Sequence, residues 1–197
     1  MKAILLAISL PLLFSSCGAL DPVKDKSVHH ILEATIPVRQ LTGSTPAIAI
    51  SRPALPSYLD RNEMVSRGAD GELKMNAYHL WGEPLDAAIS RVMAANLGRL
   101  TYSMNIQPVE NFVTMDYQRL LEIRISRFEA DAANQMVLEC TWKVQPVAGR
   151  VAPLRSFSTV IPISPEATVK SPATLSGRIR AMNEALAQLS RAIARSL

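Results

Sequence analysis

The chain is poor in the residue types that reinforce small secreted proteins or bind metals. Its 197 residues include two cysteines and three histidines, and aromatic residues make up 5%. Two cysteines form at most one disulfide, so a disulfide framework cannot be the basis of the fold. So few thiols and imidazoles leave few ligands for a transition-metal ion, and we expect no metal site. Hydrophobic residues make up 48% and charged residues 19%, which predicts a globular chain with a sizeable core.

The sequence also lacks the common catalytic motifs. It contains no Gly-x-Ser-x-Gly, no phosphate-binding loop and no His-Glu-x-x-His. His29 and His30 are neighbours on an expected strand, so they point to opposite faces and cannot chelate one ion together. His79 is expected in a loop before a helix. Cys140 falls on the inward face of a strand, which favours an inert core residue over a nucleophile. We therefore expect no catalytic residues and no cofactor, and an enzyme is the least favoured class.

Long runs of charge or of apolar residues are missing as well. The formal net charge is +4, and the basic residues are spread along the chain with no run of five or more. This pattern argues against a nucleic-acid-binding protein. The N-terminal run from Ala3 to Leu13 is too short for a membrane-spanning helix, which needs about 20 apolar residues, and it contains Pro11.

The N-terminus has the three parts of a secretory signal, ending in a cysteine. Met1-Lys2 supplies one positive charge, the apolar run follows, and Leu-Leu-Phe-Ser-Ser-Cys occupies residues 12 to 17. This order predicts a lipoprotein signal peptide over residues 1–16 and lipidation of Cys17, whose acyl chains would anchor the protein stably. The alternative is an ordinary signal peptide with a cysteine there by chance. Gly18, in place of an Asp, favours the outer over the inner membrane.

The rest of the chain divides into a tether and one domain. Residues 17–27 are polar and aperiodic and include Asp21-Pro22, so we expect a lipidated tether that reaches at most roughly 35 Å. Residues 28–197 form the expected domain. Its periodicities predict strands and two main helices, hence a strand-rich α/β (α+β) domain with a single mixed sheet. The expected strands cover 28–35, 47–51, 64–67, 72–77, 101–106, 116–129, 135–145 and 155–163, and the expected helices run from Pro84 to Gly98 and onwards from Ser171.

Several patterns support these elements. Asp70-Gly71 lies between two extended runs, which is typical of a hairpin turn. The alternation in 135–145 places one apolar set on a single face: Met136, Leu138, Cys140, Trp142 and Val144. In the preceding strand the inward set is Leu121, Ile123 and Ile125, with Phe128 as a candidate. The last helix carries a stripe of Leu175, Ile179, Met182, Leu186, Leu189 and Ile193, which fits either a coiled coil with a partner or, as we favour, a helix packed on the sheet of its own domain.

The most distinctive stretch runs from Arg52 to Gly68 and reads RPALPSYLDRNEMVSRG. Two prolines restrict the backbone just before Tyr58, Leu59, Asp60 and Arg61. Two interpretations remain open. Tyr58 and Leu59 would cap the core while the charged pair is solvated, or the four residues would contact a partner.

This stretch resembles the PqiC family of ABC-type transport auxiliary lipoproteins, also described as membrane integrity-associated transporter subunits. The resemblance rests on AIAISRPALPSYLDRNEMVSRG, on the following Ala77-Tyr78-His79-Leu80-Trp81-Gly82-Glu83-Pro84-Leu85, and on a helix ending in Ala95-Asn96-Leu97. A weaker likeness covers Tyr117 to Trp142, including Phe128-Glu129, and continues to the closing helix. His29-His30 and Gly82 depart from the family pattern.

The resemblance implies a fold similar to the N-terminal domain of TolB and a role in lipid transport. Such lipoproteins act as lipid-anchored subunits at the outer membrane, facing the periplasm, and dock an MCE-domain (PqiB-like) protein of a transport system that supports membrane integrity. The family pattern carries over Cys17 as the lipid anchor and Tyr58, Leu59, Asp60, Arg61 and Trp81 as candidate partner-binding positions. It also leaves room for a homo-oligomer. A lipoprotein that itself binds a phospholipid or another apolar ligand is the alternative.

Overall fold

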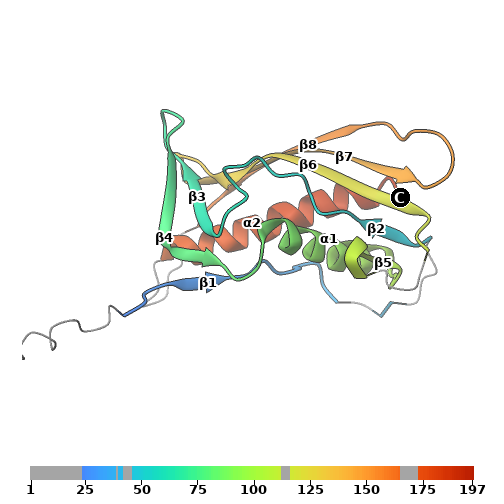
Figure 1. Ribbon diagram of the computed structural model, residues 1–197, viewed down its shortest axis with the longest axis horizontal. Helices are drawn as coiled ribbons and strands as arrows, with labels where there is room; N and C mark the ends of the chain where they lie inside the picture. The colour runs from blue at the N-terminus through green and yellow to red at the C-terminus, as the bar shows by residue number, and fades with distance from the viewer. Residues whose placement is uncertain (1–23, 39, 42–45, 112–115, 165–172) are drawn as a thin grey trace, which may run out of the picture.

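The computed structural model describes residues 24–38, 40–41, 46–111, 116–164 and 173–197. They form one α+β domain, in which a mixed eight-stranded sheet is covered on one side by two helices (Figure 1). This confirms the expected fold class. The strands are β1 (Val28–His30), β2 (Ile48–Ile50), β3 (Glu63–Arg67), β4 (Leu73–Trp81), β5 (Ile106–Pro108), β6 (Arg119–Ala130), β7 (Gln135–Pro146) and β8 (Arg155–Pro162), and the helices are α1 (Leu85–Thr101) and α2 (Ala173–Ala194), with a 3-10 turn at Val109–Asn111.

Strand β6 is the centre of the sheet. One of its edges pairs antiparallel with β7, which pairs in turn with β8. Its other edge is shared by two parallel strands, β2 at its beginning and β3 at its end, with a single bridge from Ala54 to Arg124 between them. Strand β4 forms the expected hairpin with β3 and carries β1 as a short parallel edge strand. The chain from β2 to β3 therefore follows one edge of β6. It leaves this edge after Ala54 and returns to it in β3.

The helices cover the inward face of this sheet. Helix α1 buries its apolar side through Leu85, Ile89, Val92 and Leu97, and the stripe of α2 is buried at Met182, Leu186, Leu189 and Ile193. Both helices share one core with the inward residues of β6 and β7. The interpretation of α2 as a helix packed on its own domain is thus confirmed. The start predicted for this helix, Ser171, lies outside the described residues.

The first expected strand is much shorter than predicted. Only Val28–His30 is a strand, although Leu32 and Ile36 are buried as an inward strand face would be. Side chains of the helices satisfy this segment's backbone instead of a strand partner. Asn183 and Asn96 accept the N–H groups of Glu33 and Ile36, and Arg91 and Arg99 donate to the carbonyls of Leu32, Ala34 and Ile36.

Three further predictions around α1 are wrong. Gly98 does not end the helix, which continues to Thr101 and is closed by Tyr102 in a left-handed conformation with φ 58°. The expected strand from Thr101 therefore begins only at Ile106. Gly98 is needed for another reason: a Cβ atom there would lie 2.8 Å from the backbone oxygen of Ser103. His79 lies on β4 and not in a loop.

A β-bulge interrupts β6. Ile125 pairs with Cys140, but the next pair is Arg127 with Glu139, so Ser126 is an extra residue. After the bulge, Phe128 faces the core and Glu129 faces the other side of the sheet, opposite the helices. The inward face predicted for this strand holds on both sides of the bulge, and Phe128 is fully buried.

Candidate functional site

The distinctive motif lies where the chain leaves the edge of β6. The segment 55–62, here called the motif loop, connects the bridge at Ala54 with β3. Its backbone is held by a turn in which the N–H of Leu59 donates to the carbonyl of Pro56, 2.9 Å away. At its end the N–H of Trp81 donates to the carbonyl of Asn62 at 2.7 Å. The two prolines and these bonds give the loop a defined path beside β6, between the bridge at Ala54 and the start of β3.

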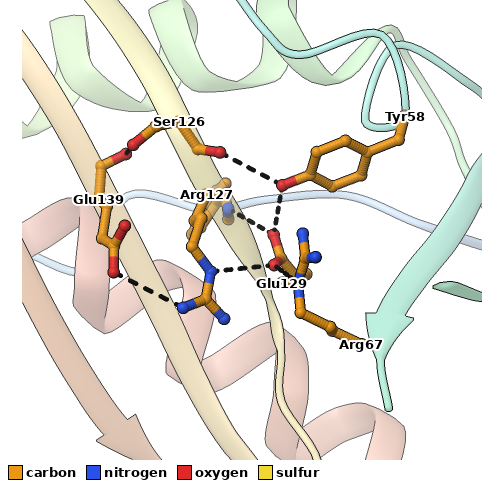
Figure 2. Close-up of polar contacts among 7 residues, drawn as sticks. Tyr58, Arg67, Ser126, Arg127, Glu129 and Glu139 are labelled. Atoms are coloured by element: carbon orange, nitrogen blue, oxygen red, sulfur yellow. Dashed lines mark hydrogen bonds and ion pairs between the residues drawn. The ribbon is translucent and has the colours of Figure 1, made fainter. Parts of the chain in front are cut away.

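Tyr58 fastens this loop to the bulged part of β6. Its hydroxyl donates to Glu129 Oε2 at 2.9 Å and lies 3.3 Å from the carbonyl oxygen of Ser126, as Figure 2 shows. The guanidinium of Arg67 on β3 lies over the Tyr58 ring, 5.3 Å from its centre. One side chain of the motif loop thus contacts groups from β3 and β6 at once.

Glu129 is the centre of the contacts, and its side chain is 0% exposed. Arg67 Nε donates to its carboxylate at 2.8 Å, Arg127 Nε at 3.2 Å, and the backbone N–H of Phe128 at 2.9 Å. A buried carboxylate costs a large desolvation free energy unless its oxygens are satisfied in this way. We call Tyr58, Arg67, Arg127, Glu129 and Glu139 the Glu129 cluster; Glu139 is 3.6 Å from Arg127 Nη1.

The electrostatics of the cluster favour a structural role. Burial and then the Glu129 charge raise the pKa of Tyr58, so this phenol stays protonated and donates. The hydrogen bond that Arg67 donates to Glu129 raises the pKa of Arg67. Two guanidinium groups face two carboxylates, which leaves no net charge for a ligand. The adjoining cavity, between Leu59 and Phe128, measures about 10 Å³ and has no space for a substrate.

The predicted partner-binding residues are divided between core and surface. Leu59 and Trp81 are buried in the core, and Tyr58 packs against it. Asp60 is exposed on the motif loop, and Arg61 is partly exposed with its Nε 3.6 Å from Glu63. The structure therefore does not gather the five residues into one patch, and their role in binding a partner stays a prediction. The sequence did not predict that Arg67, Arg127 and Glu129 form a site. The one pattern that could have indicated Glu129 is a carboxylate directly after Phe128, an aromatic residue expected to face the core.

Two of the three histidines pair with each other, and Cys140 is buried. His30 and His79 pair across β1 and β4 with Nε2 and Nδ1 2.9 Å apart. Their ring centres are 5.2 Å apart, so the two nitrogens point at each other and share a hydrogen instead of converging on an ion. Within the described parts of the chain, no three His, Cys, Asp or Glu residues gather as metal ligands. Burial raises the pKa of the Cys140 thiol to about 12, which fits the core position predicted for it.

Two of the larger hollows in the described part of the chain are open grooves. One of about 380 Å³ lies between α1 and β5, and Arg91 and Arg99 on its wall are already bonded to the backbone of 32–36. The other, of about 340 Å³, lies on the outer face of β6 and β7, where Lys143 pairs with Glu122. Neither groove shows the enclosed apolar wall that an acyl chain requires.

The N-terminal predictions fall outside the described residues. Cys17 and the signal peptide are not among them, so lipidation stays a prediction. Within the described chain, neither helix has the length and apolar character needed to cross a bilayer.

Comparisons with known proteins agree with this fold. A crystal structure described as an uncharacterized protein aligns with a TM-score of 0.65 at 17% identity, covering 85% of this chain and 99% of that chain. A protein from Xanthomonas campestris aligns with a TM-score of 0.67 at 14% identity, covering 85% of this chain and 93% of that chain. At these identities the likeness shows the fold alone. No curated protein matches the chain.

A family model identifies the chain directly. The model described as "ABC-type transport auxiliary lipoprotein component" matches residues 30–194, from the last residue of β1 to the end of α2. The match includes the motif loop and the Glu129 cluster. The chain therefore belongs to the family of ABC-type transport auxiliary lipoprotein components.

Proposed function

We propose that the protein is a lipid-anchored periplasmic subunit that docks an MCE-domain (PqiB-like) partner at the outer membrane. The family match over residues 30–194 carries the proposal, because it assigns an auxiliary role in transport and describes no enzyme. The balanced Glu129 cluster and the filled cavity beside it agree with a binding role rather than catalysis. Cys17 would supply the anchor in this arrangement.

The motif loop is the surface that we expect the partner to contact. Its base is fixed by Tyr58 and Leu59, so Asp60 and the partly exposed Arg61 are presented on a rigid support. Rigid presentation lowers the entropy lost when two proteins associate. The buried members of the motif would then act by positioning the exposed ones.

A pull-down from crosslinked cells with the tagged full-length protein tests the docking role. We expect recovery of an MCE-domain protein, and loss of membrane anchoring for Cys17→Ala. Asp60→Ala should weaken the recovery, while the same change at Asp70, which is also exposed and lies in the β3–β4 turn, should not. Recovery of envelope lipid without an MCE-domain protein would contradict docking and favour the alternative of a lipid-binding lipoprotein.

A further inference from the structure

The connection between β7 and β8 displays an apolar surface that the proposed function does not use. Residues 147–154, here called the apolar loop, read VAGRVAPL. The side chains of Val147, Val151 and Leu154 are 64%, 83% and 66% exposed. Three large aliphatic residues this exposed within eight positions are unusual for a solvated loop, which suggests an interaction surface.

The apolar loop has a defined shape. The side chain of Gln145 spans it, accepting from the N–H of Ala152 at 3.0 Å and donating to the carbonyl of Arg150 at 3.4 Å. The N–H of Val147 donates to the carbonyl of Gln118 at 3.0 Å, and Gly149 adopts φ 120°, which few other residues tolerate. The backbone of the loop is thus fixed, with Val147, Val151 and Leu154 exposed on it and Leu154 also lining the groove on the outer face of the sheet.

The charged residues of the loop and of the strand segments next to it in sequence have one sign. Between Cys140 and Ser164 the sequence contains Lys143, Arg150 and Arg155 and no aspartate or glutamate. Lys143 is paired with Glu122, and the Arg155 guanidinium lies 5.4 Å from the centre of the Trp142 ring. Arg150 is exposed within the apolar loop itself. An exposed aliphatic loop that carries an exposed arginine and no acidic residue of its own matches the interface of a bilayer that contains anionic lipids.

The loop also lies far from the chain's N-terminal end. Ile106, Ile48, Arg119 and Pro146 form one row across the sheet at the end of β7, where the apolar loop begins. Strand β1, which leads towards the N-terminus, lies at the opposite end of the molecule (Figure 1). A protein held by a lipid at one end alone is free to swivel, and a contact at the other end would fix its long axis.

We propose that the apolar loop inserts into the surface of a phospholipid bilayer, with Val147, Val151 and Leu154 among the acyl chains and Arg150 at the anionic head groups. The loop is a second membrane attachment, so the domain lies with its long axis along the membrane. The observations favour an anionic bilayer over a protein because the three exposed aliphatic residues share the loop with an exposed arginine and with no acidic residue. The proposal requires only a membrane-attached protein, so it is independent of docking to an MCE-domain partner.

Fluorescence of the full-length protein reconstituted in vesicles tests the insertion. The vesicles contain phosphatidylethanolamine and phosphatidylglycerol, with or without brominated acyl chains that quench tryptophan. Val151→Trp places a reporter in the loop, and the native Trp81 and Trp142, both buried, are subtracted as background. Val38→Trp is the matched control, because Val38 is a valine of similar exposure, 78%, outside the loop.

We expect the bromolipid to quench the Val151→Trp reporter at least about twofold more than the Val38→Trp reporter. Adding Val147→Ser and Leu154→Ser to Val151→Trp should reduce this quenching, as should Arg150→Gln or vesicles of phosphatidylcholine alone. Equal quenching of the two reporters would mean general adsorption and would overturn the proposal. Quenching of neither reporter would also overturn it, and would favour a partner protein that receives the loop in a pocket.

Discussion

Replacing Glu129 with Gln perturbs the Glu129 cluster with little change in volume. The carboxylate accepts from Tyr58, Arg67, Arg127 and the backbone N–H of Phe128. An amide in its place keeps one acceptor oxygen but turns an NH₂ group towards these donors. The variant therefore loses the charge that compensates two guanidinium groups, and a donor faces a donor.

The expected loss of stability follows from burial and distance. Removing one partner of a buried ion pair costs about 3–5 kcal/mol. The Arg67 and Arg127 side chains are 29% and 30% exposed, so water takes over part of their charge and the lower end of this range applies. We expect Glu129→Gln to lower the free energy of unfolding by about 3 kcal/mol. With a urea m-value of about 2 kcal/mol/M, the unfolding midpoint falls by about 1.5 M.

Urea unfolding followed by circular dichroism measures this difference. Glu139→Gln is the control: the Glu139 side chain is 41% exposed and lies 3.6 Å from the same Arg127, so its loss should cost about 0–1 kcal/mol. Tyr58→Phe should destabilise the protein less than Glu129→Gln, and the double variant should show coupling between the two. A Glu129→Gln loss below about 1 kcal/mol, equal to the control, would refute the idea that the carboxylate fastens the motif loop.

Three other predictions concern separate parts of the fold. Burial and the nearby His79 lower the pKa of His30, so on acidification the unfolded chain takes up a proton at a higher pH than the folded protein does. The free energy of unfolding should therefore fall as the pH drops below about 6.5. Urea titrations at each pH should show a smaller fall for His30→Phe than for the unchanged protein. Cys140, whose pKa is raised to about 12, should react with iodoacetamide at pH 8 only after unfolding, and rapid native labelling would contradict its burial. Gly98→Ala should cost about 1–3 kcal/mol despite the better helix propensity of alanine, because its Cβ would meet the Ser103 carbonyl; thermal melts that show stabilisation would disprove that contact.

The long elements could be predicted because each repeats its pattern many times. The alternation of β7 names five inward residues; Met136, Leu138, Cys140 and Trp142 are buried, and Val144 is partly buried against the core. The stripe of α2 likewise predicts which of its residues face the core. In both cases the burial of one face decides the structure, and that information is local in the sequence.

The segment that follows β1 could not be predicted, since the groups that bond to its backbone are distant in sequence. Leu32 and Ile36 alternate as in a strand, yet Asn96 and Asn183 take up the hydrogen bonds of their segment. The Glu129 cluster depends on tertiary structure in the same way. Arg67 lies 62 residues from Glu129, and no spacing rule brings them together.

The bulge at Ser126 determines where the chain can gain or lose a residue. In a regular strand, deleting one residue turns every later side chain to the opposite face. Here the opposite holds, because Ser126 is the residue in excess: without it, Arg127 would follow Ile125 in an unbroken ladder, and Phe128 and Glu129 would keep their present sides. The deletion would remove the carbonyl that lies 3.3 Å from the Tyr58 hydroxyl, but not the frame of the strand. Among relatives of this chain, a one-residue gap at Ser126 would therefore preserve the core. The same gap two residues earlier would preserve it only if Ser126 then moved into the regular ladder and the bulge disappeared.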